Sequence, residues 1–249
     1  MSDALRSLLF SVVLCLVCGT LLTAASSGLK DIQQKNMTID QRKNILKSVG
    51  LVREEQSYAG DEINRIYEQN IRRMLVDHAG NVIQASSSNT PKNETALPIY
   101  LYTTKAGEVE AYVIPIDSRG LWGKIHGYLA LKNDGATIIG FTIYKHSETP
   151  GLGGEIEQNW FQQNFVGKKI IAPGGEFVSI SIAKGKAGGS APKDRLANFV
   201  DGISGATLTG QFLTQGLKEI LTSYEGVSVA FRNTEEYCRN SKDRPWCRK

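Results

Sequence analysis

The longest apolar run of the chain lies near its N-terminus. Residues 8–25 carry no charged side chain, and these 18 residues are about the minimum that spans a bilayer core. The pattern predicts a transmembrane anchor over 8–29, preceded by a short tail at 1–7. A cleaved signal peptide is the alternative, since small residues follow the run, but the run is long and a basic cluster does not precede it.

Two helical patterns follow the anchor within residues 30–98. Residues 31–50 become helical and end at Gly50, a residue suited to the position just after a helix. Residues 57–75 place apolar side chains on one stripe, which predicts a second helix. The members of that stripe are Ile63, Ile66, Tyr67, Ile71 and Met74. The Ser-, Asn- and Pro-containing residues 86–98 read as a loop.

From residue 99 the apolar period changes to two, which is typical of strands. The runs at 99–104 and 109–116 flank "KAGE", and a second pair within 124–147 flanks "NDG", so each pair predicts a hairpin. This stretch therefore predicts an antiparallel sheet.

Helical and strand patterns then alternate toward the C-terminus. We expect a helix at 154–170, a strand at 176–185 and a helix at 206–226. The apolar face of the last helix would comprise Leu208, Phe212, Leu213, Leu217, Ile220 and Leu221. The fold class is thus α+β, with one folded domain over 99–225 and a tail over 226–249.

Composition and charge exclude several function classes. A net charge of +4 without basic runs between aromatics gives no sign of nucleic-acid binding. The three histidines lie far apart and none pairs with a cysteine, so we expect no metal site. We find no catalytic triad or nucleophile elbow and expect no catalytic residue. Cys15 and Cys18 read as small residues of a membrane helix, whereas a disulfide between Cys238 and Cys247 is an open alternative.

Two motifs could bind a ligand through the main chain. In "ETPGLGGE", residues 148–155, three glycines leave the backbone bare, although an ordinary strand-to-helix connection has the same look. In "DGISGAT", residues 201–207, Ser204 would cap a helix whose free N–H groups favour an anion. A phosphate there would touch the Thr207 hydroxyl, with Asp201 orienting that hydroxyl or a cation, but a capped turn without ligand remains the alternative. The same letters "GAT" in "NDGAT", residues 133–137, lie in a hairpin turn and offer no helix end.

The motif "DGISGAT" resembles the flavinylation motif in which the final threonine takes FMN through a phosphoester bond, attached by a flavin transferase that uses FAD. The segments "GLKDIQQKN", "QRKNIL", "VGKKI" and the long run 120–157 resemble the C subunit of bacterial sodium-translocating NADH:quinone oxidoreductases. The resemblance covers about residues 5–225, and it leaves the tail with its two cysteines outside.

This resemblance implies a single-pass anchor in the bacterial inner membrane followed by an FMN-binding domain. The covalent flavin, on Thr207, would relay single electrons from NADH oxidation toward quinone, coupled to sodium export, as part of a six-subunit pump. The domain would lie on the periplasmic side, although the cations that follow the span, Lys30, Lys35, Arg42 and Lys43, favour the cytoplasm on a simple count. A periplasmic tail would also favour the disulfide.

The resemblance also implies the residues around the flavin. Trp122 would pack near the isoalloxazine ring, and Lys184 would lie on the flavin or phosphate side. The remaining expected site residues are Glu148, Thr149, Gly151 and Leu152 of the glycine loop, and Asp201, Ser204, Gly205 and Ala206 beside Thr207. Two other functions stay open: the G subunit of an Rnf-type ion-translocating complex, and a membrane-anchored binding or sensory domain without electron transfer.

Overall fold

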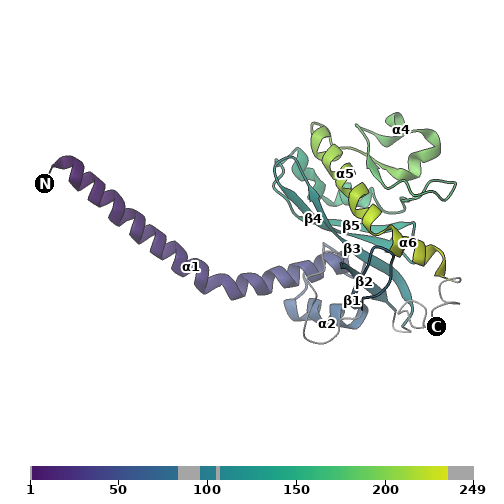
Figure 1. Cartoon of the computed structure of the whole chain (residues 1–249), viewed down its shortest axis with the longest axis horizontal. Helices are drawn as coiled ribbons and strands as arrows, with labels where there is room; N and C mark the ends of the chain where they lie inside the picture. Colours follow the sequence, from purple (N-terminus) through teal and green to yellow (C-terminus); the bar gives the residue numbers. More distant parts are fainter. Residues whose placement is uncertain (1, 84–95, 105–106, 235–249) are drawn as a thin grey trace. The chain divides into compact units, whose positions relative to one another are not determined.

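The structure is a computed structural model that describes residues 2–83, 96–104 and 107–234. The predicted Cys238–Cys247 disulfide and most of the predicted loop 86–98 lie outside these residues. The chain divides into two compact units, Met1–Gln41 and Arg42–Lys249. The elements in chain order are α1 (Asp3–Ser48), α2 (Gly60–Asn70), β1 (Ile71–Val76), β2 (Leu97–Thr103), β3 (Val109–Arg119), β4 (Lys124–Lys132), β5 (Ile138–Lys145), η1 (Gly153–Glu157), α3 (Asn159–Gln163), β6 (Ser181–Ile182), α4 (Ala187–Ser190), η2 (Lys193–Asn198), β7 (Phe199–Val200), α5 (Thr207–Ser223) and α6 (Glu225–Arg232) (Figure 1).

The predicted anchor and the predicted helix 31–50 form one helix, α1. Its most apolar 18-residue window has a mean hydropathy of 2.5, so α1 is long and apolar enough to cross a membrane. The helix ends at Ser48, and Gly50 takes its predicted position just after the helix with a φ of +75°. The N–H of Gly50 donates to the carbonyl of Lys47 and the N–H of Leu51 to that of Leu46, which is the Schellman pattern.

A five-stranded antiparallel sheet in the order β1-β2-β3-β4-β5 forms the centre of the second unit. The two predicted hairpins are confirmed as β2–β3 and β4–β5. Each strand of this sheet pairs with its neighbour in sequence, and for β2–β3 and β4–β5 this short-range pairing follows from the turn residues of the hairpin.

Helices α5 and α6 pack against the sheet and complete the core (Figure 1). Leu213, Leu217 and Leu221 of α5 are fully buried. Gly216 lets α5 approach β3 so closely that a Cβ at this position would overlap the Ser118 side chain. Helix α6 begins at Glu225 and buries Phe231, so residues 226–232 belong to the packed core and not to a free tail.

The helix predicted over 57–75 is confirmed only over Gly60–Asn70, and its last five residues are wrong. Helix α2 ends at Asn70, and Ile71 and Met74 lie in β1, paired with Tyr102 and Ile99 of β2. The apolar spacing of "IRRMLV" fits either structure over so short a length, and pairing with β2 decides the outcome.

Two further predicted elements are shorter than expected. The helix predicted at 154–170 is broken at Gln158, whose backbone is extended with φ −72° and ψ 142°, and yields only η1 and α3. The strand predicted at 176–185 reduces to β6, which pairs in parallel with β7. Ser179 interrupts it because its φ of +67° lies in the left-handed region.

Candidate functional site

Three segments far apart in sequence converge on one groove of about 190 Å³. They are the loop between β3 and β4, the loop after β5, and the start of α5. The groove is lined by Leu121, Trp122, Glu148, Thr149, Leu152, Gly153, Gly205, Ala206, Thr207, Leu208 and Thr209. Seven of the predicted site residues are therefore brought together: Trp122, Glu148, Thr149, Leu152, Gly205, Ala206 and Thr207.

The buried carboxylate of Glu148 ties these three segments together. Its Oε1 accepts a hydrogen bond of 3.0 Å from the backbone N–H of Trp122, and its Oε2 accepts one of 2.6 Å from the Thr209 hydroxyl. Glu148 is 5% exposed and Thr209 2%. Gly153 makes room for this contact, because a Cβ there would lie 2.5 Å from the Thr209 hydroxyl oxygen. Both carboxylate oxygens thus serve to hold the walls of the groove.

The start of α5 presents Thr207 to the groove. The helix begins at Thr207, and the N-cap residue Ala206 supplies no side-chain hydrogen bond. The expectation that Ser204 caps the helix is wrong, because the cap position falls two residues later. In the described part of the chain the exposed Thr207 hydroxyl has no hydrogen-bond partner. An uncapped helix start with free N–H groups and a positive dipole end favours an anion.

Exposed apolar side chains surround Thr207. Trp122 is 69% exposed, Leu208 53% and Leu152 44%, which is unusual for large apolar residues gathered around one groove. Leu208, predicted on the buried face of its helix, lies on the rim instead. The groove is smaller than pockets that enclose a drug-sized ligand, typically about 300–1,000 Å³, so a planar ligand would lie against the rim and remain partly exposed.

Asp201 forms its hydrogen bonds with residues 186–187 and not with the Thr207 hydroxyl. Its Oδ1 accepts a 2.8 Å hydrogen bond from the N–H of Ala187, and its Oδ2 one of 2.9 Å from Lys186. These contacts, the Ala187 N–H first, hold the pKa of Asp201 below its usual range. Both carboxylate oxygens of Asp201 are therefore bonded to residues 186–187 and not to the Thr207 hydroxyl that they were expected to orient. Asp201 instead fastens the turn before α5 to residues 186–187.

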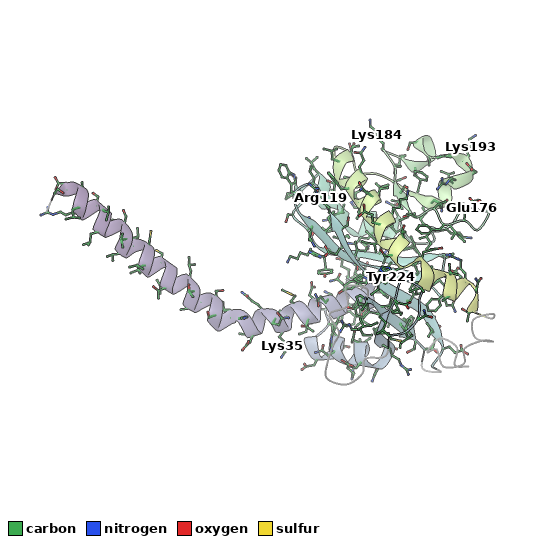
Figure 2. All side chains as sticks on the ribbon, viewed as in Figure 1. Lys35, Arg119, Glu176, Lys184, Lys193 and Tyr224 are labelled. Carbon is green, nitrogen blue, oxygen red and sulfur yellow. The ribbon has the colours of Figure 1, made fainter. Side chains whose placement is uncertain are left out.

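Lys184 and Gly151 do not line the groove. Lys184 is exposed and extends outward from the edge of the domain (Figure 2). Gly151 forms the exposed turn of its loop with a φ of +73°. The residues that the sequence did not single out for the site are Leu121, Gly153, Leu208 and Thr209. No local pattern marks Thr209, because its hydrogen-bond partner Glu148 lies 61 residues away in the sequence.

The threonine of the second "GAT", Thr137, is hydrogen-bonded within a hairpin turn, as predicted. The Thr137 hydroxyl donates to Asp134 Oδ2 at 2.6 Å, and the N–H of Thr137 donates to Oδ1 at 2.8 Å. The Thr137 hydroxyl is therefore bonded inside the turn between β4 and β5, whereas the Thr207 hydroxyl has no such bond to any residue in the described ranges.

Comparison with known proteins identifies the class to which this fold and groove belong. Residues 120–222 match the family model of the FMN-binding domain, and this range contains every residue of the groove. This region of the chain thus matches the class of FMN-binding domains.

Longer matches extend beyond that domain. The chain is 33% identical over 229 residues to the C subunit of the Na(+)-translocating NADH-quinone reductase of Yersinia pestis, covering 82% of this chain and 83% of the relative. It is 31% identical over 232 residues to the same subunit of Pseudomonas aeruginosa, covering 83% and 87%. The chain belongs to the C-subunit family of Na(+)-translocating NADH-quinone reductases. The crystal structure of the C subunit from Parabacteroides distasonis superposes with a TM-score of 0.67 at 29% identity, covering 80% of this chain and 96% of that one. The predicted fold class is confirmed.

Proposed function

We propose that this chain carries FMN covalently on Thr207, through a phosphoester bond, and serves as a membrane-anchored redox subunit of the sodium-translocating NADH-quinone reductase. One observation carries the proposal: an exposed threonine hydroxyl, without a hydrogen-bond partner among the residues that the structure describes, at the uncapped start of a 17-residue helix and inside the groove of the region that matches the FMN-binding domain.

The start of α5 suits the phosphate end of the ligand. The N–H groups of Thr207, Leu208 and Thr209 have no intrahelical acceptor, since the first turn of a helix leaves them free. Together with the helix dipole they stabilise negative charge at this position. Gly205 adopts a φ of +75°, and its missing side chain leaves space beside Leu152, whose Cδ2 would lie 2.8 Å from a Cβ.

The apolar rim suits the ring end of the ligand. Trp122, Leu152 and Leu208 offer flat and aliphatic surfaces around Thr207. When bound, FMN supplies the redox chemistry, accepting and releasing single electrons. The residues of the chain bind it, fix its orientation and keep one edge accessible to partners, because the groove is too small to enclose it.

The place of the subunit follows from its family and its anchor. We propose that it receives electrons derived from NADH and passes them toward quinone, with the other subunits of the six-subunit pump as donor, acceptor and sites of sodium transport. Helix α1 would hold it in the inner membrane with the flavin domain on the periplasmic side, where a flavin transferase attaches FMN. The bonding of both Glu148 oxygens is in keeping with a carrier whose groove residues position the ligand.

The test is co-expression with a flavin transferase, followed by a denaturing gel viewed under ultraviolet light before staining. We expect a fluorescent band for the wild type and for Thr137→Ala, and its loss in Thr207→Ala. Thr222→Ala is the matched control, because Thr222 is an exposed threonine of the same helix.

The location and the existence of the covalent bond are decided separately. A band that persists in Thr207→Ala places the attachment elsewhere. A dark wild-type band, when a known substrate of the transferase is labelled in parallel, refutes the covalent flavin and favours an anchored binding domain without electron transfer.

A further inference from the structure

His146 lies directly behind the groove, just after the end of β5, and does not line it. Its side chain is 11% exposed. Its Nδ1 accepts a hydrogen bond of 3.1 Å from the backbone N–H of Glu148, and its Nε2 lies 3.1 Å from Oε2 of Glu157 in η1. Both ring nitrogens therefore have a protein partner.

These two contacts select one tautomer. A backbone N–H can only donate, so Nδ1 must carry a lone pair and no proton. The proton of the imidazole then sits on Nε2 and is donated to the Glu157 carboxylate. The contact with Glu157 anchors the ring, and the ring in turn anchors the main chain of Glu148.

Glu148 is consequently held by hydrogen bonds at both its backbone N–H and its carboxylate. His146 fixes its main chain, while the Trp122 N–H and the Thr209 hydroxyl fix its carboxylate. The chain then turns at Thr149, whose carbonyl accepts the N–H groups of Leu152 and Gly154 at 3.1 Å and 2.9 Å. A Cβ on Gly154 would lie 3.5 Å from His146 Cε1, so the ring packs against the far side of the same turn.

We propose that His146 is a positioning residue of the flavin groove. Its imidazole, protonated on Nε2 and held by Glu157, sets the direction in which Glu148 enters the groove, and through Glu148 the relative placement of Trp122 and α5. The role of His146 toward the flavin rests on the function proposed above, whereas its tautomer does not.

The tautomer is tested in the absence of flavin. The Thr207→Ala chain, purified in detergent with ¹⁵N-labelled histidine, gives ring signals from His78, His126 and His146, and His146→Asn assigns the third set. We expect the His146 Nδ1 signal to be that of an unprotonated nitrogen and the Nε2 signal that of a protonated one. A proton on Nδ1 overturns the proposal, whatever the outcome of the flavin gel.

The positioning role is tested on the flavin-loaded full chain with two variants. Asparagine at 146 can still accept the Glu148 N–H two residues on, as in an Asx-turn, whereas alanine cannot. We expect the flavin's visible circular dichroism and the quenching of tryptophan fluorescence to be kept in His146→Asn and reduced in His146→Ala, with the covalent band present in both. Glu157→Gln, which keeps an acceptor for Nε2–H, should resemble the wild type.

Equal loss of the flavin signature in His146→Asn and His146→Ala overturns the proposal, as does a wild-type signature in His146→Ala. If His146→Ala does not fold, the comparison of His146→Asn with the wild type and the tautomer measurement decide. A wild type without a covalent band speaks against the proposed function and leaves the tautomer result standing.

Discussion

Thr209→Val tests whether the Glu148 carboxylate holds the groove together. Valine has nearly the shape of threonine, so the change replaces the hydroxyl with a methyl group and creates no cavity. Glu148 then keeps the N–H of Trp122 but loses its 2.6 Å hydrogen bond to Thr209. Because both side chains are at least 95% buried, water cannot easily replace the missing donor.

The magnitude follows from the charge and the burial. A hydrogen bond to a charged group contributes about 1.5–3 kcal/mol, and a buried acceptor left unsatisfied loses most of it. We expect a loss of about 2 kcal/mol in the free energy of unfolding. For a domain of this size that lowers Tm by about 4–8 °C.

The assay is thermal unfolding of the full chain in detergent, followed by circular dichroism, with Thr222→Val as the matched control. Thr222 is exposed on the same helix and donates only to the Lys218 carbonyl, so its change should stay within about 0.5 kcal/mol. In a Glu148→Gln background, which removes the charge, the effect of Thr209→Val should shrink. The reasoning is refuted if Thr209→Val destabilises the chain no more than Thr222→Val.

Two more perturbations address the turn before α5. Gly205→Ala should lower Tm and the extent of covalent flavin labelling more than Gly151→Ala. Both residues have positive φ, but only at 205 does the new Cβ meet a neighbour, Leu152, and Leu152→Ala should recover part of the difference. Asp201→Asn should destabilise the chain at pH 7, because the lowered pKa of Asp201 means that its carboxylate stabilises the folded state above about pH 4. That difference should shrink as the pH falls below about 4 and through the lowered pKa, so a difference between the two unfolding curves that stays constant on acidification would contradict the assignment.

The elements that can be predicted from the sequence are those with their own local chemistry. The two hairpins follow from their turn residues, and the end of α1 follows from Gly50. The strand formed by "IRRMLV" cannot be predicted from its own residues, because its pairing with β2 joins residues 21 to 31 positions apart. The break at Gln158, whose backbone is extended, likewise has no marker such as Gly or Pro in the local sequence.

The site residues also differ in whether the local sequence marks them. The uncapped helix start is a local feature of "SGAT", yet the sequence favours Ser204 as the cap because cap residues are recognised by type and not by backbone geometry. The convergence of Trp122 and Glu148 on Thr207 is implied only by the resemblance to a family, since no periodicity links these positions. Thr209 has no such signal of its own, because its importance lies in a partner 61 residues away.

The position of Thr207 on α5 has a consequence for how the protein matures. The same helix buries Leu213, Leu217 and Leu221 in the core and packs on β3 through Gly216. A transferase that needs Thr207 at the start of a formed helix, beside Trp122 and Leu152, would therefore label only chains whose core is already assembled. The fluorescence of the band on the gel would then report the fraction of chains that have folded. The modification would in effect select folded chains before the protein joins its partners.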